Sequence, residues 1–389
     1  MDFNADYGLN TFLAHFGEEE KVKGAVVPPI FQNSLFVFDS YEEFVSGIYE
    51  RPQGPPYHYS RIGNPTVDLA ERKIAQLEGM EAAKLCGTGM GAITLAVMSC
   101  VEAGAHVVAV DTCYVPTRYL FEQYLAKFGV TVTFVSGRCK EEIFDSIRPE
   151  TKLVYLESPS SIVFRLQDVE AIAQHCREKK VTTIIDNTYC TPIFSNPGKM
   201  GIDIVVHSGT KYFSGHSDLT AGAVCSTQER IDQLARIEIN LLGSILAPFP
   251  AWLLTRGLRT LGIRMKRHEE TGNTVAAWLE EQPQIERVNH VGLPSYPQRD
   301  LFLKQMRGSS SLFSIEPKNQ NKDAVIRFVE KLTLFQLGIS WGGFESLVVP
   351  LHAKPDDWDE PRWLVRLFCG LEEPEDLIAD LKQALVELN

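Results

Sequence analysis

The sequence predicts an α/β protein with a mostly parallel central sheet, helices on both faces of that sheet, and a smaller C-terminal α/β domain. The main observation is that short apolar segments alternate with amphipathic segments from residue 83 to about 226. Such alternation is typical of βαβ units, which bury parallel strands between helices. A second observation is the length of 389 residues, which is enough for two or three structural units.

The elements are expected in the following order along the chain. Residues 1–54 show no sustained periodicity, and we interpret them as an extended arm. Asn64-Pro65-Thr66 starts a helix with one apolar face, and Pro374 starts the last helix. The domain that holds the main sheet is expected at 55–250 and the C-terminal domain at 251–389. The expected strands are 106–110, 131–135, 153–157, 182–186, 203–207 and 222–225, with helices such as 117–128 and 168–179 between them.

The composition argues against nucleic-acid and membrane partners. The chain has 38 basic and 50 acidic residues, a net charge of −12, and no block of Lys or Arg. Its longest uncharged stretches are interrupted by glycine or proline, so we expect no membrane span. The eight cysteines form no CxxC pair and no ligand cluster, which predicts reduced thiols and no metal site. Because no signal-peptide pattern is present, we expect a cytoplasmic protein. The acidic run Glu18-Glu19-Glu20 is expected to be exposed.

Polar residues follow several expected strands within a few positions. Ligands of doubly wound sheets bind beyond the carboxyl ends of the strands, so these residues are candidates for a site. They are Tyr114, Ser158, Asp186, Asn187, Ser208, Thr210 and Lys211.

The segment Gly87-Thr88-Gly89-Met90-Gly91-Ala92 matches the dinucleotide pattern G-x-G-x-x-A, and Asp111 ends the next expected strand. Physically, the loop offers only bare N–H groups at a helix N-terminus, which can receive any phosphate. A nicotinamide, a flavin or a pyridoxal phosphate would each fit, and the glycines could also be structural. The loop alone leaves these alternatives open.

Asp186 and Lys211, at the ends of two neighbouring expected strands, favour pyridoxal phosphate. They could form a simple salt bridge. However, this cofactor requires a lysine amine for covalent attachment and an acid that keeps the pyridine nitrogen protonated. The hydroxyls of Ser208 and Thr210 would add donors for the phosphate, and Tyr114 could lie flat on the ring. An oxidoreductase that transfers hydride has no use for this lysine and acid.

Several separated segments match one family pattern in order. They are Tyr59-Ser60-Arg61-Ile62-Gly63-Asn64-Pro65-Thr66, Gly89-Met90-Gly91-Ala92, Asp186-Asn187-Thr188, Ser208-Gly209-Thr210-Lys211-Tyr212 and Gly215-His216-Ser217-Asp218. With these segments the chain resembles the Cys/Met-metabolism family of fold-type I pyridoxal-phosphate enzymes, from about Gly24 to the C-terminus. The resemblance implies the transferase-like fold of that class.

The resemblance also implies roles for individual residues. Lys211 would bond to the cofactor and carry the proton, Asp186 would pair with the pyridine nitrogen, and Tyr114 would stack on the ring and assist proton movements. Arg366 would grip the substrate carboxylate together with Ser340 and Trp341. The residues implied for the phosphate are Gly89, Met90, Ser208 and Thr210, joined by Tyr59 and Arg61 from a neighbouring subunit, with Tyr59 also near the substrate. A homo-oligomer with shared active sites follows, a dimer at least and a tetramer in typical members, with the arm used for subunit contacts.

Within the family, three segments resemble bacterial cystathionine β-lyase: Thr255–Arg264, Gly308–Ser314 and Ser340–Leu347. Pro116 stands where γ-lyases of the methionine type carry a reactive cysteine. The resemblance thus implies a carbon–sulfur β-lyase of methionine biosynthesis and transsulfuration. It would cleave L-cystathionine, or another S-substituted L-cysteine, to a thiol such as homocysteine, pyruvate and ammonia.

Ile339 departs from the pattern, because the β-lyase usually has tyrosine there and the γ-synthase glutamate. One wall of the substrate mouth is therefore apolar, and a smaller S-substituted cysteine could be the better substrate. Cystathionine γ-synthase or γ-lyase chemistry remains an alternative, and racemisation a side activity. Two remote alternatives are a NAD-dependent oxidoreductase and a binding protein without activity. Both are disfavoured, because neither gives Lys211 and Asp186 a role.

Overall fold

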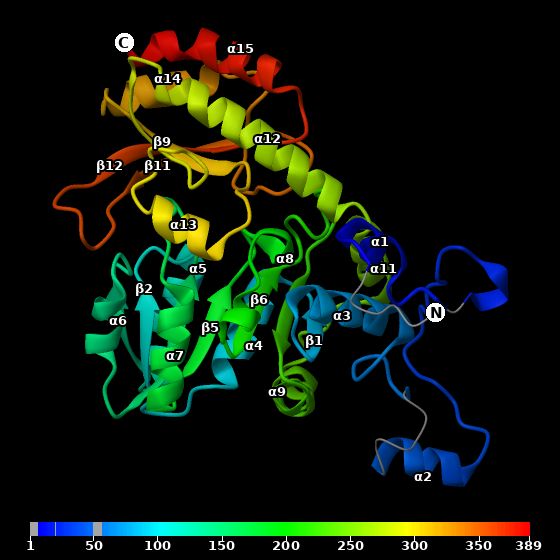
Figure 1. The fold of residues 1–389 in the computed structure, drawn as a ribbon. Helices are drawn as coiled ribbons and strands as arrows, with labels where there is room; N and C mark the ends of the chain where they lie inside the picture. The colour runs from blue at the N-terminus through cyan, green and yellow to red at the C-terminus, as the bar shows by residue number, and fades with distance from the viewer. Residues whose placement is uncertain (1–6, 20, 50–56) are drawn as a thin grey trace.

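The computed structural model describes residues 7–19, 21–49 and 57–389. Its larger sheet has seven strands in the order β1-β7-β6-β5-β4-β2-β3 (Figure 1). Strands β2 to β6 run parallel, whereas β7 is antiparallel to both β1 and β6. The predicted mostly parallel sheet is thus confirmed. Its strands are β1 Ala82–Cys86, β2 His106–Val110, β3 Thr131–Val135, β4 Thr151–Glu157, β5 Thr182–Asp186, β6 Ile204–Ser208 and β7 Gly222–Ser226.

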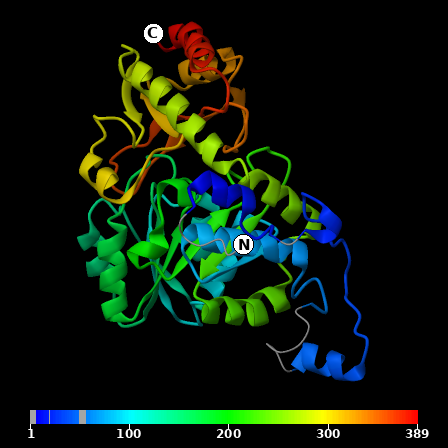
Figure 2. The same ribbon diagram turned by 45° about the vertical axis from the view of Figure 1, so that its right-hand side comes forward.

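Helices pack on both faces of this sheet, as expected (Figures 1 and 2). The predicted helix over 117–128 differs from the structure, because a short α-helix continues there as a π-helical turn at Leu120–Tyr124 and a 3-10 turn at Leu125–Phe128. The α-helices of this part are α3 Pro65–Glu78, α4 Gly89–Met98, α5 Val115–Tyr119, α6 Lys140–Ser146, α7 Val169–Lys179, α8 Thr191–Phe194, α9 Gln228–Leu234 and α10 Asn240–Leu242.

The N-terminal segment is not wholly extended, because it contains the helices α1 Leu9–His15 and α2 Tyr41–Tyr49. Two or three helical turns produce too little periodicity to be recognised in a sequence. Nor is the whole acidic run exposed: Glu18 is buried and accepts hydrogen bonds from Lys73 and Arg259, each at 2.8 Å. Burial opposes ionisation of Glu18, but the bonds from the two cations lower its pKa below the usual value. Glu18 therefore anchors the arm to α3 and to the helix pair that follows the large sheet.

A second sheet of five strands, in the order β10-β11-β12-β9-β8, follows the helices α11 Pro248–Leu258 and α12 Leu261–Glu280. It lies against its own helices at the end of the molecule that also holds the C-terminus (Figure 1). The last helix begins at Pro374, as predicted. The domain limits 55–250 and 251–389 stay a prediction. The elements are β8 Ile285–Asn289, β9 Leu312–Pro317, β10 Gln336–Leu337, β11 Leu347–Ala353, β12 Arg362–Phe368, α13 Arg299–Gln305, α14 Lys322–Lys331 and α15 Pro374–Ala384.

The structure has two buried apolar clusters: one surrounds the larger sheet and extends to Leu312, Leu347 and Phe368 of the smaller one, and the other lies between the smaller sheet and its helices. All eight cysteines are free thiols, and six of them are buried. Within the ranges described above, no helix is long and apolar enough to cross a membrane. The two sheets meet where loops between β10 and β11 approach the carboxyl ends of β5 and β6, and this junction holds the candidate site.

Candidate active site at the junction of the two sheets

Lys211 lies just beyond β6, and its backbone N–H donates to the carbonyl oxygen of Ser208 at 3.1 Å. Its amine nitrogen donates to the hydroxyl of Ser340, at 2.6 Å, from the loop between β10 and β11. Gly342 in the same loop has a φ of +88°, and a Cβ there would come within 2.9 Å of the Lys211 backbone. Glycine is therefore needed for the loop of the second sheet to lie directly on Lys211.

The surroundings of Lys211 favour a neutral amine. Burial and the positive charge of Arg366 lower the pKa of Lys211 to about 8, although the carboxylate of Asp186 acts in the opposite direction. The side chain also lies with its nitrogen 5.3 Å from the centre of the Trp341 ring. A lysine with a lowered pKa at a strand end is suited to attack a carbonyl group or to accept a proton.

Asp186 ends β5 and accepts hydrogen bonds from the backbone N–H and the hydroxyl of Thr188. Burial raises the pKa of Asp186, while the bonds from Thr188 and the nearby His207 and Lys211 favour its charged form. In the part of the chain that the structure describes, Asp186 and Lys211 form no direct ion pair. The simple salt bridge that the sequence allowed is therefore wrong, and the carboxylate is available to a third, positively charged group.

The glycine loop opens α4 next to the end of β6. Thr88 caps this helix by accepting the N–H groups of Gly91, through its hydroxyl, and of Ala92, through its carbonyl. The first N–H groups of the helix, those of Gly89 and Met90, are then left for a ligand. A Cβ at Gly89 would lie 2.7 Å from the Ser208 hydroxyl, so glycine allows the helix to start directly beside this side chain.

Thr210, also predicted to hold the phosphate, lies beside this loop. Its hydroxyl exchanges hydrogen bonds with the backbone of Ala221, donating at 3.3 Å and accepting at 3.0 Å. Thr210 thus lies at the site, but its hydroxyl already forms hydrogen bonds with the Ala221 backbone.

Arg366 and Tyr114 form the other side of the site. The guanidinium of Arg366, on β12, donates to the carbonyl oxygens of Ile339 and Ser340 at 2.8 and 3.2 Å. Burial lowers the pKa of Arg366 to about 10, an effect that nearby Tyr114 opposes. Tyr114 precedes α5 and is about half exposed. The predicted substrate residues Arg366, Ser340 and Trp341 therefore lie together with Lys211 and Tyr114.

Tyr59 and Arg61 are not brought to this site within the chain. Tyr59 bridges to Leu35, and Arg61 donates to the carbonyl oxygen of Asn240 at 2.9 Å. The Arg61 guanidinium also lies 5.3 Å from the centre of the Tyr59 ring. The two residues thus form a unit of their own, apart from the described residues around Lys211.

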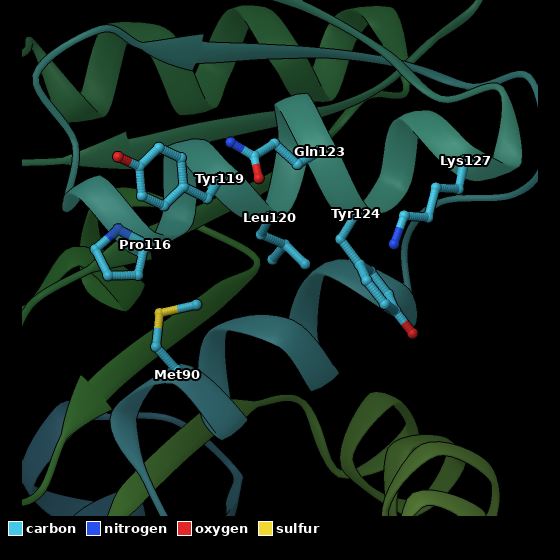
Figure 3. A pocket seen from close by; sticks show the side chains of 7 residues that line it. All are labelled: Met90, Pro116, Tyr119, Leu120, Gln123, Tyr124 and Lys127. Carbon is cyan, nitrogen blue, oxygen red and sulfur yellow. The ribbon is translucent and has the colours of Figure 1, made fainter.

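A surface pocket of about 420 Å³ is lined by Met90 from the glycine loop and by residues that follow β2 (Figure 3). Met90, from the start of α4, faces side chains from α5 and the π-helical turn across this pocket. The two aromatic rings of this lining, Tyr119 and Tyr124, are about half exposed. The lining residues are Met90, Pro116, Tyr119, Leu120, Gln123, Tyr124 and Lys127.

The arrangement fits pyridoxal phosphate better than a dinucleotide. It combines a lysine with a lowered pKa, a carboxylate free of direct ion pairs, and a helix start with free N–H donors. Asp111, which a dinucleotide would need for its ribose, accepts the backbone N–H of Asp356 at 2.7 Å and lies 3.7 Å from Arg165. Because the Asp111 carboxylate already contacts Asp356 and Arg165, it is not available to bind a ribose, which argues against a dinucleotide site.

Three buried polar residues near the site were missed by the sequence argument. Glu157 ends β4 and lies opposite Asp186 in the register of β4 and β5. Glu157 ends its expected strand just as Asp186 does, but the sequence argument did not select it. Glu78 accepts a 2.6 Å hydrogen bond from His207 beneath the site, and no signal in the sequence joins these two residues.

Comparisons with known proteins cover nearly the whole chain. The family model described as "Cys/Met metabolism PLP-dependent enzyme" matches residues 10–386. The chain is 40% identical to an L-methionine gamma-lyase of Porphyromonas gingivalis, over 98% of both chains. It is 35% identical to a protein of Rhizobium johnstonii named "Putative cystathionine beta-lyase", over 97% of this chain and 95% of that protein. The crystal structure of metB from Corynebacterium glutamicum matches it with a TM-score of 0.91 and 30% identity, over 99% of each chain.

The lowered pKa of Lys211 leads to a prediction for covalent attachment of pyridoxal phosphate to the protein without cofactor. Only the neutral amine attacks the aldehyde, and a lowered pKa means that this form dominates above about pH 8. We expect the attachment rate, followed by absorbance, to rise with pH and to level off above that value.

Two variants on β12 provide the matched comparison for this measurement. Arg366→Gln should move the midpoint to higher pH, because it removes the positive charge that lowers the pKa of Lys211. Arg362→Gln should leave it unchanged, since Arg362 pairs with Glu316 instead. A midpoint near the usual lysine value of 10.5 in the unmodified protein would contradict the site described here.

Proposed function

This chain belongs to the Cys/Met-metabolism family of PLP-dependent enzymes, and within it we propose a carbon–sulfur β-lyase that acts on S-substituted L-cysteines. The reaction breaks the bonds from Cα to hydrogen and from Cβ to sulfur, and it releases a thiol. The remaining three-carbon enamine hydrolyses to pyruvate and ammonia. With L-cystathionine as substrate, the thiol is homocysteine.

The position of the Lys211 amine is the observation that carries this proposal. The amine is held between the Ser340 hydroxyl and the Trp341 ring. A β-elimination needs the base to remove one proton, from Cα, whereas a γ-elimination needs a second proton to be removed from Cβ. A lysine amine that is held in one place can remove the single proton on Cα. Its position therefore favours β-elimination, which needs fewer proton transfers than γ-elimination.

Each residue of the site has a place in this proposal. When bound, pyridoxal phosphate draws electrons away from Cα and makes its proton acidic. Lys211 takes that proton, and its lowered pKa increases the fraction of neutral amine that can accept it. Asp186 holds the pyridine nitrogen, and Tyr114 covers the ring. Gly89, Met90 and Ser208 bind the phosphate, next to Thr210.

Substrate recognition is assigned to Arg366 and Ile339. The guanidinium of Arg366 is fixed by two carbonyl oxygens and keeps further N–H donors for the substrate carboxylate. Ile339 is 86% exposed at the mouth of the site and offers no partner for a charged group. The distal amino-acid end of cystathionine would lose water there without compensation, so a small apolar substituent on sulfur fits better.

A γ-elimination is the second candidate, favoured by the 40% identity to a protein named L-methionine gamma-lyase. Pro116, which lines the surface pocket, favours the β-lyase instead. It has no thiol, whereas γ-lyases of the methionine type carry a reactive cysteine at this position.

We also propose that a second copy of the chain completes each site, in a tetramer built from dimers. Tyr59 and Arg61 contact Leu35 and Asn240 in their own chain, away from Lys211. They would reach the phosphate side of a neighbouring site, where Met90 borders the pocket with its exposed rings (Figure 3).

The products distinguish the two reactions. We expect the protein loaded with pyridoxal phosphate to form pyruvate from L-cystathionine and from S-ethyl-L-cysteine, in amounts equal to the thiol released. The ratio kcat/KM should be about tenfold higher for S-ethyl-L-cysteine, because its substituent needs no charged partner at Ile339. Chromatography of the keto acids provides the measurement. Formation of 2-oxobutyrate from L-cystathionine or L-methionine would instead establish γ-elimination.

Mixing two inactive variants tests the shared site. Lys211→Ala lacks the base, and Arg61→Ala lacks the proposed phosphate contact. If each site combines Lys211 of one chain with Arg61 of another, a mixed dimer contains one intact site. We expect unfolding and refolding of an equal mixture to restore about a quarter of the activity. No recovery, although mixed dimers form, would show that each chain builds its site alone.

A further inference from the structure

Glu157 is a buried acid beside the site to which the proposed reaction gives no role. It is the last residue of β4 and only 8% exposed. One carboxyl oxygen accepts the backbone N–H of Tyr114 at 2.7 Å, and the other accepts the hydroxyl of Ser161 at 2.6 Å. Both carboxyl oxygens thus accept hydrogen bonds, one from the segment after β2 and one from the segment after β4.

Glu157 also lies next to Asp186, because the two residues are partners in the parallel pairing of β4 and β5. Burial and the negative charge of Asp186 raise the pKa of Glu157 to about 8. Asp186 is instead supported in its charged form by Thr188, His207 and Lys211. Burial and the nearby Asp186 therefore disfavour the charged form of Glu157, whereas Thr188, His207 and Lys211 favour the charged form of Asp186.

The Tyr114 backbone has few other attachments. Its carbonyl oxygen accepts the N–H groups of Thr117 and Arg118 in the helix that it starts, and its side chain makes no capping bond. Among the described residues, Glu157 is the group of the large sheet that forms a hydrogen bond with the Tyr114 backbone. A change at Glu157 would therefore remove or alter this bond at the residue that carries the ring.

We propose that Glu157 is a positioning residue that holds Tyr114 against the bound cofactor and connects it to the strand end where Asp186 lies. This inference rests on the proposed place of Tyr114 over the pyridine ring. It does not depend on whether the reaction is a β- or a γ-elimination.

The test uses the protein loaded with pyridoxal phosphate and no substrate. Visible circular dichroism of the bound cofactor reports the asymmetry that a stacked ring imposes, and gel filtration followed by absorbance reports cofactor loss. We expect Tyr114→Ala to remove most of the dichroic signal. Glu157→Ala should reduce it strongly and release the cofactor about tenfold faster, because the Tyr114 N–H loses its acceptor. Glu157→Gln should keep most of the signal, since its amide oxygen can accept the same bond.

Two more variants separate positioning from folding. Ser161→Ala removes the other partner of Glu157 and should leave the signal nearly unchanged. Glu157→Asp keeps the acid but draws it back by one methylene from the Tyr114 N–H, and it should lower the signal even if Glu157→Ala does not fold.

The outcomes are distinct from those of the reaction assay. A full signal in Tyr114→Ala would show that Tyr114 does not cover the cofactor, and the inference would fail with it. A reduced signal in Tyr114→Ala together with unchanged signals in Glu157→Ala and Glu157→Asp would overturn the role of Glu157 alone.

Discussion

A negative charge on Asp186 at the end of β5 is the constraint on which the site depends. Burial disfavours this charge, so the surrounding structure must support it. Thr188 donates two hydrogen bonds to it, the nearby His207 and Lys211 favour its charged form, and burial beside Asp186 raises the pKa of the neighbouring Glu157. A carboxylate kept charged in this way, without a direct ion pair, can hold a cationic ring nitrogen. Burial and the positive charge of Arg366 lower the pKa of Lys211, although Asp186 acts in the opposite direction.

The second sheet is as necessary to the site as the first. Its loops place Ser340 and Trp341 on the Lys211 amine, and β12 contributes Arg366. Gly342 makes this approach possible, because any side chain there would meet the Lys211 backbone. The larger sheet thus supplies the groups proposed for the cofactor, and the smaller one supplies the groups proposed for the substrate.

Physical reasoning on the sequence could locate the cofactor side of the site. The carboxyl ends of parallel strands meet at one edge, so residues after separate strands, such as Asp186, Ser208 and Lys211, were expected to converge. The substrate side needed the family resemblance, because no strand rule connects Arg366 with Ser340. Glu157 was missed although it ends its strand as Asp186 does, because its partners Tyr114 and Ser161 are known only from the structure. Glu18 was misjudged because its partners, Lys73 and Arg259, are remote in the sequence.

The attachment point of the cofactor tests the central claim most directly. Borohydride reduction of the protein loaded with pyridoxal phosphate fixes the cofactor on the lysine that carries it, and mass spectrometry of peptides then identifies that lysine. We expect the label on Lys211, and its loss in Lys211→Ala but not in Lys266→Ala, which changes an exposed lysine of α12. A label on another lysine of the unmodified protein, or the absence of any label, would contradict the site at the junction of the two sheets.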